Sequence, residues 1–183
     1  GVEKMNKKEA LYFADLVEIL KSIPDIEIST EDDGFNIKIN NHSPLEEVKC
    51  KYVCENRIWS KNYILVFEVK KKIVSNCEDI IVLNKATWEQ KNNNYNLIVN
   101  RLNDNELLSN MVQKFIKLGG CIKINIYNQI IRIRANMLPG TIVSLILPPI
   151  TKFIVPQKNE IVLLFQIMQI ILKELKYSYE EVE

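Results

Sequence analysis

Histidine is nearly absent from this chain of 183 residues, in which His42 is the only one. Ser-His-acid and Cys-His catalytic sets both need an imidazole, so either would have to use His42, which lies in a turn-like NHSP context. Zinc sites need closely paired ligands, and Cys50 with Cys54 offers one pair without a second. We therefore predict no catalytic residues, no metal site and no cofactor.

The chain also lacks an excess of charge of either sign. Its 24 basic and 23 acidic residues nearly cancel, so net charge gives no argument for nucleic acid or an acidic substrate. Glycine is scarce too, with five residues, and the Gly119-Gly120 pair follows a predicted helix instead of preceding one, unlike a phosphate-binding loop. Any anion site must therefore be local.

Long hydrophobic runs are missing as well. The longest apolar stretch, residues 161–172, contains twelve residues, two of them Gln, whereas a membrane span needs about 20 predominantly apolar residues. We expect a core helix there. The four scattered cysteines are weak evidence for disulfides in a chain of this length, which favours a reducing compartment. The predicted location is the cytoplasm or the cytoplasmic face of a membrane.

The most informative pattern that is present is the stretch 121–135, CIKINIYNQIIRIRA. A two-residue turn at Asn128-Gln129 makes it a β-hairpin in which all the isoleucines of both strands except Ile130 share one face. A slip of one residue would mix the two faces, so the pattern fixes the register. That register places Lys123 opposite Arg134, an unfavourable pair unless an anionic group lies nearby.

Helical and alternating periodicities fill the rest of the chain. Amphipathic spacing predicts helices over 6–23, 103–118 (capped by Asp104 or Asn103) and 157–177. Alternation and apolar runs predict strands over 26–30, 35–39, 48–56, 63–67, 80–83, 95–99 and 141–147. We predict an α+β fold, a mainly antiparallel sheet of hairpins with about three helices packed on one face. Residues 1–183 form one domain in this interpretation, with a subdomain boundary near 90–95 as the alternative.

Two groups of residues are candidate sites. The polar face of the hairpin carries cations and hydrogen-bonding groups suited to an anion, namely Lys123, Arg132, Arg134, Tyr127 and Asn125. The alternative is a solvent-facing surface on which a neighbouring carboxylate relieves the like-charge pair. The last helix is apolar around most of its circumference, which predicts a partner or dimer interface at Ile161, Leu164, Phe165, Met168 and Leu172.

The absence of a catalytic constellation favours a non-catalytic interaction or scaffold domain that binds a protein partner or a second copy of itself. Gly1 is typical of a residue left by tag removal and Val2 is not a natural initiator, so one hypothesis is the soluble portion of a membrane-anchored bacterial-type protein. The alternatives are an anion- or nucleic-acid-binding module using the 121–135 hairpin, with nucleic acid disfavoured by the net charge, and an enzyme of unrecognised type. Membrane contact is expected only through a segment outside this sequence.

Overall fold

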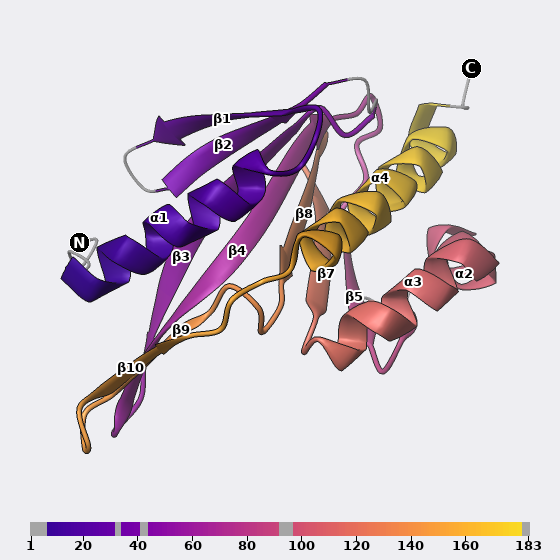
Figure 1. Cartoon of the computed structure of the whole chain (residues 1–183). Coiled ribbons are helices and arrows are strands. Elements are labelled where there is room, and N and C mark those ends of the chain that lie inside the picture. Colours follow the sequence, from indigo (N-terminus) through magenta and orange to yellow (C-terminus); the bar gives the residue numbers. More distant parts are fainter. Residues whose placement is uncertain (1–6, 32–33, 41–43, 92–96, 181–183) are drawn as a thin grey trace.

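A computed structural model describes residues 7–31, 34–40, 44–91 and 97–180 of the chain, and its described part is an α+β fold (Figure 1). The helices are α1 (Lys7–Lys21), α2 (Leu97–Asp104), α3 (Glu106–Lys117) and α4 (Lys158–Glu180). The strands of the first half are β1 (Ile26–Glu31), β2 (Gly34–Ile39), β3 (Glu47–Asn56), β4 (Ser60–Lys72), β5 (Asp79–Asn84) and β6 (Thr87–Gln90). Those of the second half are β7 (Cys121–Tyr127), β8 (Ile130–Asn136), β9 (Ile142–Leu145) and β10 (Ile150–Phe153).

All described strands belong to one antiparallel sheet. Its order is β1-β2-β3-β4-β8-β7-β5-β6, and β9, itself paired with β10, adds to the first residues of β4. The centre of the sheet is β4, which pairs with β3, β8 and β9. The apolar run Tyr63-Ile64-Leu65-Val66-Phe67 lies within it.

The hairpin of β7 and β8 has the predicted register. Ile124 pairs with Ile133, Asn125 with Arg132, and Lys123 with Arg134. Asn128 and Gln129 form the turn with φ of 49° and 61°, the left-handed pair of a type I′ turn, whose twist matches that of the flanking strands. The alternation of isoleucine with polar residues therefore determined the pairing in this part of the fold.

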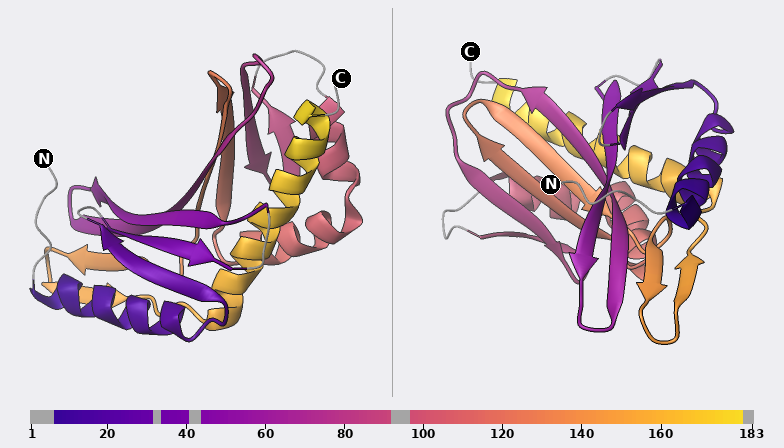
Figure 2. Two further views of the ribbon diagram at one scale, coloured as in Figure 1. Left: turned by 90° about the horizontal axis from the view of Figure 1, so that it is seen from above. Right: turned by 90° about the vertical axis from the view of Figure 1, so that its left-hand side faces the viewer.

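The described helices cover one face of the sheet, and the core lies between the two layers (Figures 1 and 2). Phe13 of α1 packs edge-on against Phe35 of β2, and Phe165 of α4 packs edge-on against Phe67 of β4. We call the opposite side of the sheet the open face, because no described helix covers it.

The structure buries the five residues of the last helix that were predicted to form an interface. Exposed fractions of the five predicted residues are between 0 and 7%, because α4 crosses the sheet and also packs against α2 and α3. The residues concerned are Ile161, Leu164, Phe165, Met168 and Leu172. The apolar side chains around this helix pack into the core of the same chain, so these five side chains offer no surface to a partner.

Four elements differ from the sequence-based expectations. Residues 97–99, predicted as the end of a strand, begin helix α2, in which Ile98 and Leu102 are buried at helical spacing. Residues 95–96 of that predicted strand lie outside the described part. The N-cap of α3 is Asn105, whose side-chain oxygen accepts from the Leu108 N–H at 2.9 Å. Strand β6 and the short extent of β9 were also unforeseen.

Candidate functional site

The open face carries a row of polar side chains that crosses five strands. Register pairs join Asn36 to Lys49, Lys49 to Glu68, Glu68 to Arg134 and Arg134 to Lys123, from β2 through β3, β4 and β8 to β7. Neighbours in such a row lie within reach of each other's side chains. The side chains of this row therefore determine whether a carboxylate lies beside the like-charge pair of Lys123 and Arg134.

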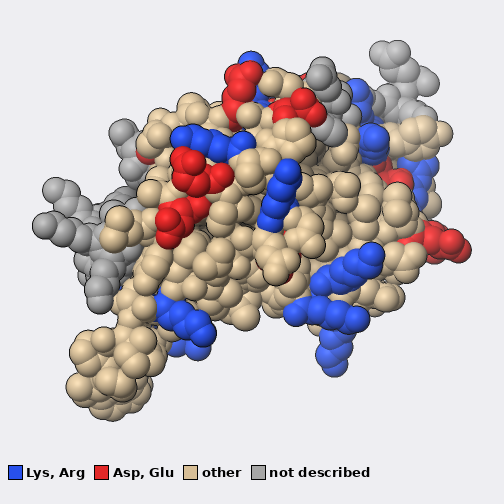
Figure 3. Space-filling model, in the orientation of Figure 1, with Lys and Arg blue, Asp and Glu red and all other residues tan. Residues whose placement is uncertain are grey.

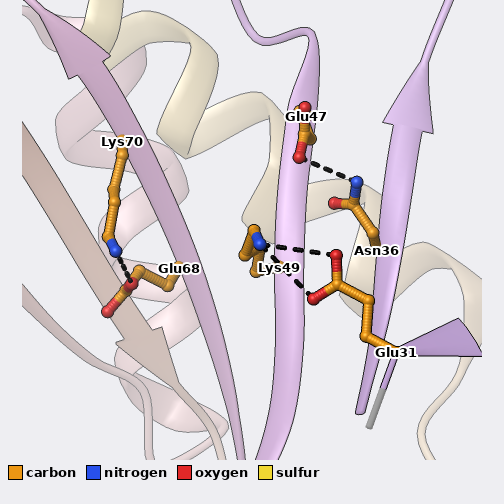
Figure 4. A network of polar contacts seen from close by, with 6 residues as sticks. All are labelled: Glu31, Asn36, Glu47, Lys49, Glu68 and Lys70. Atoms are coloured by element: carbon orange, nitrogen blue, oxygen red, sulfur yellow. Dashed lines mark hydrogen bonds and ion pairs between the residues drawn. The ribbon is translucent and has the colours of Figure 1, made fainter. Parts of the chain in front are cut away.

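Glu68 is the carboxylate beside that pair. Its oxygens lie 3.4 Å from Nε of Arg134 and 3.3 Å from Nζ of Lys70, and its side chain is only 13% exposed. Further along the face, Lys49 binds Glu31 at 3.3 Å, and the Asn36 amide donates to Glu47 at 2.7 Å (Figure 4). Carboxylates thus alternate with cations over this part of the sheet, as in the alternative interpretation of the sequence.

The structure brings the five predicted anion-site residues together on the open face of the β7–β8 hairpin. Arg134 is held by Glu68, and Tyr127 is 57% exposed at the far end. Lys123 and Arg132 have no ion-pair partner among the described residues. The side-chain oxygen of Asn125 is buried without a hydrogen-bond partner in the same described part. Two cations and an amide remain available to an anion, fewer than the sequence suggested.

A second candidate surface lies at the turns of two hairpins. The β3–β4 turn exposes Ile58 and Trp59, at 84% and 64%, and the β9–β10 turn exposes four more large apolar side chains at 40–69%. We call these residues, with the two exposed prolines between them, the apolar tip, which comprises Ile58, Trp59, Leu145, Ile146, Leu147, Pro148, Pro149 and Ile150. Soluble proteins rarely expose so many neighbouring apolar side chains without a binding role.

Backbone hydrogen bonds hold the two turns of the tip side by side. Ser60 pairs with Leu145 across β4 and β9, and the Ile146 N–H donates to the Trp59 carbonyl at 3.0 Å. Both turns project together from the body of the protein (Figure 1; Figure 2, right). In the space-filling view the projection is a knob without charged side chains on the visible face (Figure 3).

Cationic residues surround the base of the tip. Arg57 directly precedes Ile58, Lys61 lies in β4 and Lys152 lies in β10, which pairs with β9. Among the described residues, the carboxylate of Glu55 lies 3.7 Å from the Arg57 guanidinium. We call Arg57, Lys61 and Lys152 the collar. The tip is therefore an apolar projection with a mainly basic collar at its base.

The groups considered for catalysis or metal binding remain dispersed in the described structure. No group of three or more metal-ligating side chains forms among the described residues, and His42 lies outside them. Burial raises the pKa of the Cys50 thiol well above its usual range, so this thiol stays protonated and unreactive at neutral pH. None of the four cysteines, all within the described residues, forms a disulfide.

The sequence reasoning missed the apolar tip although its signals were present. Ile-Trp within a predicted turn and the Leu-Pro-Pro-Ile segment are apolar where turns are ordinarily polar. These segments are more than 80 residues apart, so only the β4–β9 pairing shows that they form one surface.

No protein-family model, curated protein or solved structure matches this chain. Among the described helices, none combines the length and apolarity needed to cross a bilayer.

Proposed function

We propose that this protein is a non-catalytic interaction domain whose contact surface is the apolar tip. The observation that carries the proposal is the six large apolar side chains, 40–84% exposed, at the ends of two hydrogen-bonded hairpins. Both hairpins are anchored in the sheet through β4, so the contact residues are presented by a rigid scaffold.

The exposure of the tip indicates a contact of moderate strength. Complete burial of a large apolar side chain contributes about 2 kcal/mol, so covering six that are on average more than half exposed gains on the order of 7 kcal/mol. Association itself costs about 4–15 kcal/mol in lost freedom. The apolar contribution alone therefore supports a reversible contact, and polar groups of the collar must supply any further affinity.

Site-specific photocrosslinking tests this proposal. Benzoylphenylalanine replaces Leu147 at the tip, or Val74 as the matched control. Val74 is 81% exposed in the loop after β4, at the other end of the strand from Trp59. In the producing cells we expect position 147 to crosslink to a defined partner in several-fold excess over position 74. Equal crosslinking at the two positions contradicts the proposal, whatever the partner.

A second candidate function is anion binding on the open face, favoured by Lys123 and Arg132. Neither has an ion-pair partner in the described structure, and they lie on adjacent strands of the same face. Inorganic pyrophosphate is a suitable probe in calorimetry at low salt. Binding that Lys123→Gln and Arg132→Gln weaken, but that Lys21→Gln on α1 leaves unchanged, supports this function. Equal effects of all three substitutions reject it.

A further inference from the structure

The dimensions of the apolar tip match the interfacial layer of a lipid bilayer. Leu145 and Ile150 form the last pair of the β9–β10 hairpin, and the turn extends about two residues beyond them. At about 3.3 Å per residue, the turn reaches roughly 7 Å past that pair. Interfacial segments bury their apolar groups about 5–10 Å into the boundary between headgroups and acyl chains.

The collar lies at the depth of the headgroups on the same scale. Lys152 pairs with Val143, two residues below the Leu145–Ile150 pair and thus roughly 7 Å further from the turn. Lys61 pairs with Ser144, so it lies at nearly the same level on β4. Cations at this level attract anionic headgroups, and the Glu55 carboxylate is offset by the Arg57 guanidinium.

The β9–β10 turn carries few backbone N–H donors. Pro148 and Pro149 carry no N–H donor, and Ile146 donates its N–H to Trp59. Behind the turn, the hydroxyls of Ser144 and Thr151 lie 3.2 Å apart and satisfy each other. Unpaired donors are costly in hydrocarbon, so a turn built with prolines suits insertion better than an ordinary polar turn does.

From these observations we infer that the apolar tip inserts peripherally into the interface of an anionic phospholipid membrane. The inference rests on the proposed function and names the partner of the same surface. A projecting convex knob needs a complementary groove on a protein partner, whereas lipids rearrange around it. Trp59 lies beside the collar, where the amphipathic indole ring is favoured at membrane interfaces. The contact differs from the sequence-based expectation of a membrane segment outside this sequence.

The two tryptophans make the insertion directly measurable. Trp59 is 64% exposed, whereas Trp88 is 2% exposed in the core, so a change of emission on vesicle addition reports on Trp59. The probes are vesicles of phosphatidylcholine alone and of phosphatidylcholine with an equal amount of phosphatidylglycerol. With the anionic vesicles we expect co-sedimentation, a blue shift of the emission, and quenching by lipids brominated on the acyl chains.

Two double variants separate the tip from general surface apolarity. Ile58→Ser with Leu147→Ser removes apolar groups from both turns, and we expect anionic-vesicle affinity to fall at least tenfold. Val74→Ser with Leu107→Ser removes comparably exposed groups elsewhere, at 81% and 59%, and we expect unchanged affinity. All four side chains are more than half exposed, so folding is retained, and circular dichroism verifies it.

The collar is tested by neutralising one cation. Lys152→Gln is expected to weaken binding to the anionic vesicles about fivefold and to leave any binding to neutral vesicles unchanged. An equal loss on both vesicle types overturns the role given to the collar.

Three outcomes overturn the membrane inference. They are no vesicle binding by the native protein, equal binding by the tip variant, and binding without a change in Trp59 emission, which would assign the contact to the basic open face. If vesicle binding is absent while position 147 still crosslinks to a protein or to a second copy in excess over position 74, the membrane inference fails and the proposed interaction function stands. If both are absent, both fail.

Discussion

Glu68 neutralises the centre of the open face, and its replacement by glutamine tests that role. The Glu68 side chain is 13% exposed and lies 3.3 Å from Nζ of Lys70 and 3.4 Å from Nε of Arg134. Its register neighbour on the other side is Lys49. Glu68→Gln keeps the shape and removes the charge, so cations of β3, β4, β8 and β7 then face one another without a central carboxylate.

The expected loss of stability is about 1–2 kcal/mol. Lys70 and Arg134 are 49% and 43% exposed, so solvent screens each ion pair and limits it to about 1 kcal/mol or less. Without the Glu68 carboxylate, repulsion between Arg134 and Lys123 adds a loss of about a few tenths of a kcal/mol. For a chain of this length the loss corresponds to a decrease in Tm of about 2–8 °C.

Urea unfolding at low salt and at about 1 M NaCl measures this effect. The Debye length falls to about 3 Å at 1 M salt, so the difference between native and variant protein should shrink there. The control is Glu18→Gln on α1, which removes a pair with Lys21 whose side chains are 73% and 59% exposed, and it should cost less than about 0.5 kcal/mol. If Glu68→Gln costs no more than this control, or if its cost is unaffected by salt, Glu68 does not neutralise the open face.

Two further predictions concern the core. Leu164 is fully buried in α4, so Leu164→Ala should destabilise the protein by about 2–5 kcal/mol in urea unfolding; a cost below about 1 kcal/mol would contradict the packing of α4. Burial, with the Cys50 thiol beside it, raises the pKa of Tyr52, whose hydroxyl donates to the Gly140 carbonyl at 2.8 Å. The unfolded hydroxyl titrates near pH 10, so its contribution to stability is present below about pH 10 and is lost as the pH rises towards the folded pKa. Between about pH 9 and pH 11, the free energy of unfolding of Tyr52→Phe should therefore decrease less than that of the native protein. An equal decrease in both proteins would show that the Tyr52 hydroxyl does not cause it.

The sequence determined the register of the 121–135 hairpin and the C-terminal end of the helix before it. Alternation of isoleucine with charged residues over 121–135 permits one register, because any slip buries Lys123, Arg132 or Arg134. Gly119 takes the left-handed conformation (φ 68°) expected after α3, and Gly120 passes so close to Phe115 that a side chain has no room. The α+β class and the antiparallel sheet followed from such local patterns.

Tertiary structure decided which apolar surfaces remain exposed. A helix such as α4, apolar around most of its circumference, has the same sequence pattern whether it packs against a partner or against its own chain. In this structure α4 packs against α2 and α3 of its own chain. The Lys123–Arg134 pair was interpretable only once β4 placed Glu68 beside it. The apolar tip joins residues 58–59 to residues 145–150 through the β4–β9 pairing. Periodicity reports on neighbours along the chain, whereas such long-range pairing depends on how the whole core is filled.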